Sequence, residues 1–188
     1  MMTSSSFHSL LGVVFSAALL SPFGLRAQSE KSTPSEFSKP VVDIGIVVAD
    51  LEKSATFYTK VLGLTEVPGF SVTAEKTAAF GLTDHQPATI RVFTLDKDAP
   101  GTRIKLMAFP ERPGVKPDQT FIHSTIGISY LTFNVTNLSQ TLQRLSEAGV
   151  KLLGQTPADL GGNKRLVAIH DPDGNFIELI GTISDTAK

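Results

Sequence analysis

The chain contains no cysteine and only four histidines. Without cysteine it cannot form a disulfide, bind a metal through thiolates or use a cysteine nucleophile. No serine stands in the G-x-S-x-G pattern of a hydrolase nucleophile, and no two histidines have the i, i+4 spacing of a helical zinc site. These absences exclude the commonest arrangements for nucleophilic catalysis and for zinc binding.

Neither sign of charge is in excess, since 17 Lys and Arg residues face 18 Asp and Glu residues. The chain has no basic block, so it lacks the electrostatic footprint of a nucleic-acid-binding protein, and we expect no nucleic-acid partner. Its 188 residues suit one domain with a core of ordinary size.

A long membrane-spanning run is also missing. The apolar stretch at residues 10–20 is shorter than the about twenty residues that cross a bilayer, and the small residue Ala27 follows it. This pattern predicts a secretory signal peptide over residues 1–27 and a flexible lead-in over residues 28–40. We therefore expect export to the periplasm or outside the cell, with no stable membrane anchor after signal removal.

One pattern is present twice, in residues 42–63 and again in residues 129–149. Each copy is an alternating strand, a turn with a capping Asp50 or Asn137, and an amphipathic helix that ends at glycine. Similar strands close the two copies. These closing strands are at residues 102–109 and 175–182. A further strand precedes each of them, at residues 89–95 in the first copy and 164–170 in the second, where a hairpin turn at residues 171–174 follows it. A duplicated module that leaves one sheet face free favours a shared cleft.

The parity of each strand predicts which side chains face that cleft. Apolar alternates should point to the helices, so the residues between them point to the opposite face, which we call the open face. Polar residues gather on this open face, and we predict that they bind a ligand. They are Asp43, Arg103, Lys105, Tyr130, Thr132, Asn134 and Glu178.

Other residues offer weaker candidates. Among the histidines, His123 leads into the second opening strand, whereas His85 suits a solvated loop and His170 suits a turn-capping role. Three phenylalanines fit the pattern of core residues but could instead contact an apolar ligand. They are Phe70, Phe80 and Phe109.

The segments DIGIVVADLEKSATFYTKVLGL and HDPDGNFIELI resemble the vicinal oxygen chelate superfamily, which includes glyoxalase I, extradiol dioxygenases, epimerases and bleomycin-binding proteins. The resemblance covers nearly all of residues 41–181. It implies an α+β fold of two tandem βαβββ modules that form a curved sheet around a cleft. Module one would be residues 41–109 and module two residues 128–181, within a glyoxalase-like domain at residues 41–183.

The resemblance also implies four positions that hold a divalent metal in the metal-dependent relatives. Here they carry Asp43, Lys105, Tyr130 and Glu178, of which only Glu178 is the usual residue. A protonated lysine has no lone pair and places a positive charge where the cation would sit. We expect no metal and no other cofactor, and we predict that Lys105 forms an ion pair with Glu178 or Asp43.

The leading hypothesis is an exported domain that binds a small molecule between its modules without metal. One alternative is a metal-dependent lyase, isomerase or dioxygenase of the glyoxalase type, in which Lys105 swings aside. Another alternative is a protein-interaction or dimerisation module, because members of the superfamily often form homodimers. Lys105 and the adjacent Arg103 would hold an anionic or carbonyl-bearing group in the leading case.

Overall fold

The computed structural model describes residues 36–39 and 41–183. The predicted signal peptide over residues 1–27 lies outside this part of the chain, as does most of the predicted lead-in. None of the helices in the described ranges has the length and apolar character that a bilayer crossing requires.

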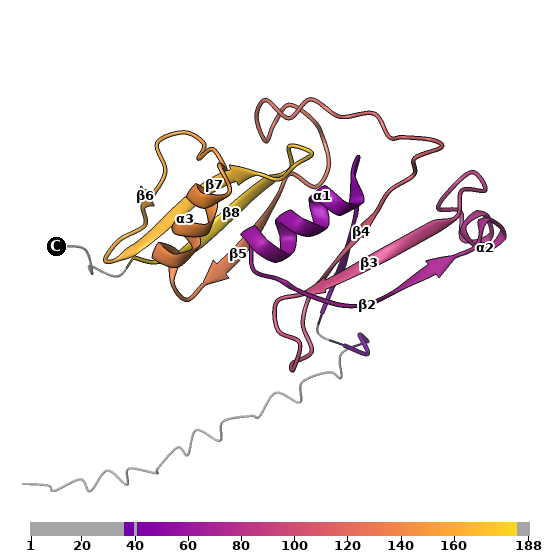
Figure 1. Cartoon of the computed structure of the whole chain (residues 1–188), viewed down its shortest axis with the longest axis horizontal. Helices are drawn as coiled ribbons and strands as arrows, with labels where there is room; N and C mark the ends of the chain where they lie inside the picture. The colour runs from indigo at the N-terminus through magenta and orange to yellow at the C-terminus, as the bar shows by residue number, and fades with distance from the viewer. Residues whose placement is uncertain (1–35, 40, 184–188) are drawn as a thin grey trace, which may run out of the picture. The chain divides into compact units, whose positions relative to one another are not determined.

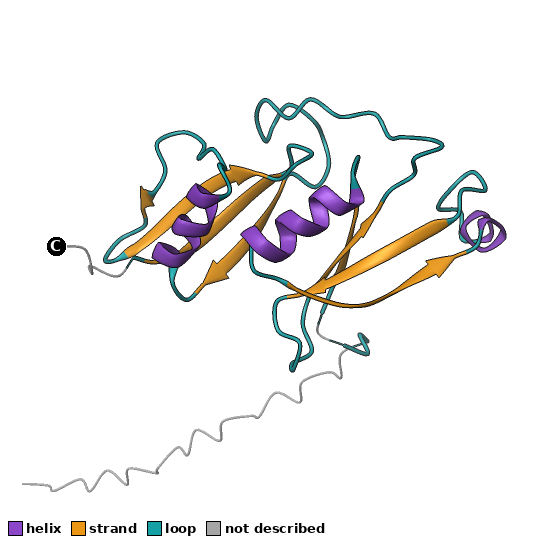
Figure 2. Ribbon diagram, viewed as in Figure 1, coloured by secondary structure: helices purple, strands orange, loops and turns teal. Residues whose placement is uncertain are grey.

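Module one forms a four-stranded sheet with the strand order β1-β4-β3-β2, and helix α1 covers one face of it (Figures 1 and 2). β1 and β4 run parallel, whereas the other neighbours are antiparallel. Its elements are β1 (Asp43–Val47), α1 (Leu51–Thr56), η1 (Phe57–Val61), β2 (Thr65–Val72), α2 (Ala74–Ala79), β3 (Ala88–Thr94) and β4 (Arg103–Met107).

Module two repeats this topology with the strand order β5-β8-β7-β6 and with a parallel pair formed by β5 and β8. Its elements are β5 (Tyr130–Val135), α3 (Leu138–Glu147), β6 (Ala158–Asp159), β7 (Lys164–His170) and β8 (Phe176–Thr182). The predicted α+β fold of two tandem βαβββ modules is confirmed. Figure 2 shows that the segment between β4 and β5 contains neither helix nor strand.

The predicted helix boundaries are also confirmed. The Asp50 carboxylate accepts a hydrogen bond from the Lys53 amide at 2.9 Å, and the Asn137 side chain accepts one from the Gln140 amide at 3.0 Å. Gly63 stops the first helix with a φ of +89°, a backbone conformation that L side chains rarely adopt.

Three elements of module one were not predicted. The first helix continues from α1 into the π-helical turn η1, and residues 68–86, which have no readable pattern, contain most of β2 and all of α2. Pro68 and Gly69 argue against a strand, but they lie where the β2–β3 register shifts between Val67 and Phe70. A Cβ on Gly69 would overlap the carbonyl oxygen of Ile90, so glycine is required by this close approach.

The core joins the helix-covered faces of both sheets. One cluster of buried side chains combines Tyr58 and Phe93 of module one with Leu138, Val167 and Ile177 of module two. A second, smaller cluster, centred on Ala88, Ile90 and Val92, lies in module one alone. It is separate from the first because its residues point to the open face.

Hydrogen bonds from the β7–β8 hairpin connect module two to module one. Asp171 is buried and accepts a hydrogen bond from the Tyr58 hydroxyl at 3.1 Å, and burial together with this carboxylate raises the pKa of Tyr58. Asp173 accepts hydrogen bonds from the Ala49 amide at 3.1 Å and the Ser54 hydroxyl at 3.3 Å. The predicted turn therefore also contributes buried polar contacts that connect the two modules.

Candidate functional site

The open face of module one begins with three charged side chains on β1 and β4. The parallel register places Asp43 beside Arg103 and Gly45 beside Lys105, so the three charged residues share one side of the sheet. All three retain some exposure, with side-chain values of 27%, 44% and 23% in the order Asp43, Arg103, Lys105. They form a continuous polar group at one end of the open face.

Within this group a single carboxylate, that of Asp43, pairs with two cationic side chains. Arg103 donates from Nε to Oδ1 of Asp43 at 2.8 Å and from Nη2 to Oδ2 at 2.6 Å, while Lys105 Nζ lies 2.8 Å from the same Oδ2. The Arg103 guanidinium and then the Lys105 ammonium hold the pKa of Asp43 well below its usual range. The group keeps one net positive charge.

An apolar floor lies next to these charges. Ile90 and Val92 of β3 are buried on the open face, and Val92 is the register partner of Lys105. Phe70 is 49% exposed, and Lys105 Nζ lies 5.7 Å from the centre of its ring, within reach of a cation–π contact. Sequence reasoning missed Ile90 and Val92 as site residues. They alternate with the polar Thr89 and Arg91, and the rule that apolar alternates face the helices would turn them away from the open face.

The predicted residues on the open face of module two form a group of opposite charge. Thr132 and Glu178 are register partners on β5 and β8, and the Thr132 hydroxyl donates to Oε2 of Glu178 at 2.7 Å. Tyr130 is 49% exposed, and Asn134 is also exposed. This second group has one net negative charge, carried by Glu178.

The seven predicted residues thus fall into two groups. Of the two predicted partners of Lys105, Asp43 forms the ion pair, whereas Glu178 accepts a hydrogen bond from Thr132. Within the described residues, no hydrogen bond or ion pair joins the groups. The cavity that includes Arg103 contains no predicted residue of module two, and the cavity that includes Asn134 contains none of module one.

His170 belongs to the open face of module two and is not a turn cap. It ends β7 opposite Phe176, whose ring lies 4.4 Å away edge to face, and the next register pair on this face is Ala168 with Glu178. Burial lowers the pKa of His170, so the ring is neutral at pH 7. Its Nε2 is buried without a partner among the described residues. The alternation in residues 164–170 could have revealed this placement.

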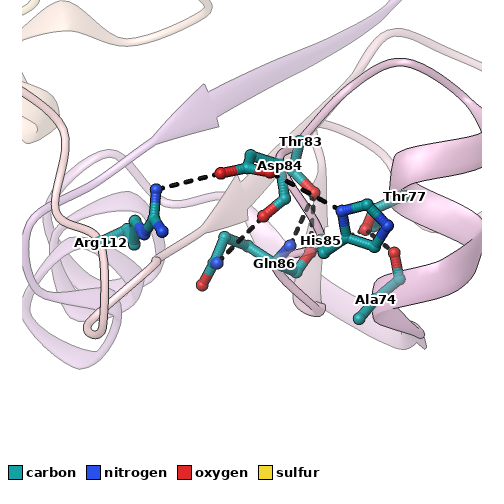
Figure 3. A network of polar contacts seen from close by, with 7 residues as sticks. All are labelled: Ala74, Thr77, Thr83, Asp84, His85, Gln86 and Arg112. Atoms are coloured by element: carbon teal, nitrogen blue, oxygen red, sulfur yellow. Dashed lines mark hydrogen bonds and ion pairs between the residues drawn. The ribbon is translucent and has the colours of Figure 1, made fainter.

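The other two candidate histidines lie away from the charged groups. His123 stacks on Phe121 with 5.6 Å between ring centres. His85 sits in the loop after α2, where Thr83 and Gln86 exchange hydrogen bonds and Asp84 pairs with Arg112 at 3.1 Å (Figure 3). This network orders the loop, and His85 is exposed beside Asp84.

The three candidate phenylalanines also differ in whether they lie on the open face. Phe109 packs partly buried against the open-face cluster of module one, next to Met107. Phe80 follows α2 and is 62% exposed. Of the three, Phe70 and Phe109 are the ones associated with the open face.

The sequence and the fold match known proteins. Residues 41–179 match the family model of the glyoxalase/bleomycin resistance protein/dioxygenase superfamily. The chain belongs to this superfamily. The match covers both modules and most of the described residues.

Solved structures support the same fold at low sequence identity. A glyoxalase family protein from Bacillus cereus has a TM-score of 0.65 at 22% identity, covering 81% of this chain and 100% of that one. The trypanothione-dependent glyoxalase I of Leishmania major has a TM-score of 0.55 at 19% identity, with coverage of 77% and 87%. An antibiotic-binding protein from Streptomyces sp. CB03234 has a TM-score of 0.53 at 21% identity, with coverage of 79% and 99%. The chain is thus a glyoxalase-fold domain related to small-molecule-binding and resistance proteins.

The side chains at the superfamily's metal positions do not fit a divalent cation in this chain. Lys105 occupies one position with an ammonium that has no lone pair, and this ammonium already pairs with Asp43 at a second position. Tyr130 occupies another of these positions with a phenol, which in its neutral form is a poor ligand for a divalent cation. Among the described residues, no three His, Asp or Glu side chains are grouped so that they could hold a metal.

Proposed function

We propose that this protein binds a small organic molecule on the open faces of its two modules without a divalent metal. The observation that carries the proposal is the cluster of Asp43, Arg103 and Lys105, in which a protein cation stands where metal-dependent relatives hold theirs. The adjoining apolar floor supports it, because ligand sites combine apolar walls with a few placed polar groups.

The charges indicate what kind of group the ligand presents to module one. The cluster has one net positive charge, and the Nη1 group of Arg103 is not used by Asp43. An anionic or carbonyl-bearing group would complete the hydrogen bonding of Arg103 and Lys105. Phe70 and Val92 would then contact the apolar remainder of the ligand.

The relatives include enzymes as well as binding proteins, such as the antibiotic-binding neighbour. The Lys105–Asp43 pair is what makes binding the first function to test. Metal-dependent lyase, isomerase or dioxygenase activity is the competing function. It would need Lys105 to leave Asp43 and the metal position.

Thermal melts with a panel of antibiotics and small carboxylic acids test the binding proposal. We expect at least one compound to raise the melting temperature in a concentration-dependent way. The double variant Arg103→Gln, Lys105→Gln should lose the shift, and Lys151→Gln, which removes an exposed lysine elsewhere, should keep it. A panel without any shift, or a shift that survives the double variant, contradicts the proposal.

Self-association is a second candidate, favoured by exposed apolar side chains between the modules. In the segment that joins β4 to β5, Ile126 is fully exposed and Ile128 is 86% exposed, next to the half-exposed Tyr130 of the open face. Exposed apolar side chains that adjoin one another are typical of an interaction surface. A second copy would cover them and would bring the positive Asp43–Arg103–Lys105 group of one copy close to Glu178 of the other.

Light scattering after gel filtration tests this arrangement. A homodimer that becomes monomeric in Ile126→Asp supports it, with Val115→Asp as the control for an exposed apolar residue at the other end of the same segment. A monomeric wild-type protein contradicts it.

We also propose that the protein is exported, on the basis of the sequence pattern in residues 1–27. Expression of the full chain in a Gram-negative host, followed by cell fractionation and N-terminal sequencing, tests this. A periplasmic product beginning at or near Gln28 is expected, and a cytoplasmic product that retains Met1 contradicts it.

A further inference from the structure

A cavity outside the two charged groups lies where the ends of β1 and β4 meet the connecting segment and the β7–β8 hairpin. Its volume is about 240 Å³, and none of the seven predicted site residues lines it. This volume is slightly below that of common ligand pockets, so it suits a compact molecule.

Most of the cavity wall is apolar. Val47 at the end of β1 is 51% exposed, and Val115 in the connecting segment is 96% exposed. Phe109 and three prolines of residues 110–117 contribute further apolar surface. A bound molecule with an apolar body would remove this surface from water, at a gain of roughly 25 cal/mol per Å².

Some polar groups of the cavity wall already have hydrogen-bond partners within the chain, and one does not. Asp173 accepts from Ala49 and Ser54. The side chains of Gln119 and Asn175 contact each other at 3.0 Å. Lys116 forms no hydrogen bond or ion pair with any described residue, so its three donors are free to bind a ligand.

The Lys116 ammonium lies close to Gly174 in the turn of the β7–β8 hairpin. Its Nζ would lie 3.3 Å from a Cβ placed on Gly174, a turn residue with a φ of +93°. The glycine therefore admits the lysine side chain as well as the turn conformation. This places a positive charge beside an apolar cavity.

We propose that this cavity binds a small organic carboxylate of a single ring or a short chain. The carboxylate pairs with Lys116, and the apolar body packs against Val47 and Phe109. Each Asp173 oxygen already accepts one hydrogen bond from the chain, whereas the Lys116 ammonium has no acceptor among the described residues, so an anionic group is the one that completes the hydrogen bonding of this wall. The site is separate from the open faces and does not depend on the function proposed for them.

A titration of the full chain with benzoate, followed by two-dimensional NMR of the backbone amides, tests the proposal. We expect saturable shifts at Val48, Ala49, Gln119 and Gly174. Benzamide, which has the same shape without the charge, should bind at least about tenfold more weakly, the effect of one lost ion pair.

Two variants locate the site. Lys116→Gln should weaken benzoate binding about tenfold without changing the melting temperature, because Lys116 has no partner to lose in the folded chain. Lys151→Gln, which removes an exposed lysine away from the cavity, should bind benzoate like the wild-type protein. Equal binding of benzoate and benzamide, an unchanged affinity in Lys116→Gln, or shifts confined to the strands around Arg103 would overturn the proposal.

Discussion

At the scale of single residues, the proposed metal-free site depends on Lys105. Its ammonium and the Arg103 guanidinium share the Asp43 carboxylate at 2.6–2.8 Å. Under the proposal, these two cations supply the charge compensation for Asp43 that a metal ion would otherwise supply. Because its side chains are partly exposed, its contribution to stability should be small.

Asp43→Asn should lower the free energy of unfolding by about 0.5–1 kcal/mol, the range of partly exposed ion pairs. The variant leaves two neighbouring cations without a carboxylate. Urea unfolding measures the change. Asp98→Asn is the matched control, since Asp98 pairs with the adjacent Lys97 on the surface, and a loss of equal size there would contradict the role of Asp43.

The cluster also predicts a pH dependence. The folded pKa of Asp43 lies well below the unfolded value of about 3.9, so its stabilisation is fully present above about pH 5 and is lost as the pH falls through 3.9 toward the folded pKa. Urea unfolding of wild type and Asp43→Asn from about pH 7 down to 3 should show a constant difference that shrinks below about pH 4. A difference that grows on acidification would contradict this sign.

An ion pair of Lys105 with a carboxylate could be predicted from the sequence, because strand parity placed Lys105, Asp43 and Glu178 on the open faces. The choice of Asp43 over Glu178 could not. It depends on the parallel register, which sets Gly45 beside Lys105 and Asp43 two register pairs away, on the same face. The position of Glu178 in another sheet, bonded to Thr132, likewise depends on tertiary structure.

At the scale of elements, the alternating strands and capped helices were readable because their periodicity and caps are local. β2 was not, because Pro68 and Gly69 are tolerated only through the bulge opposite Ile90, a contact between distant residues. His170 was misread because its place in β7 was overlooked beside the stronger turn signal of residues 171–174.

Gly69→Ala tests the bulge. The added Cβ would overlap the Ile90 carbonyl oxygen, so β2 and β3 must separate locally, and we expect a loss of about 2 kcal/mol or more. Gly114→Ala is the control, since a Cβ there meets open space. Equal melting temperatures for the two variants would show that the bulge is not as close as described.

Tyr58→Phe tests the contact of the β7–β8 hairpin with the first helix. The buried Asp171 carboxylate would lose the hydroxyl donor while keeping the Asn175 side chain, at a cost of about 1–3 kcal/mol. The same change at Tyr130, the other tyrosine, should have little effect because that ring is half exposed. Comparable unfolding curves for Tyr58→Phe and wild type would contradict the role of this hydrogen bond.

At the scale of the whole chain, two βαβββ modules share a core on their helix-covered faces and leave both open faces outside it. The predicted residues on one open face carry a net positive charge, and those on the other carry a net negative charge. This division explains why polar residues assigned by sequence to one surface appear as two groups. It also makes a second copy a natural way to bring them together, as proposed above.

The most direct test of the account is metal analysis of the purified protein before and after incubation with Zn, Ni, Mn and Fe(II), with a thermal melt of each sample. The account predicts less than stoichiometric metal and no change in melting temperature, because Lys105 holds Asp43 and occupies the metal position. Stoichiometric metal with a raised melting temperature would contradict it and assign the protein to the metal-dependent enzymes of the superfamily.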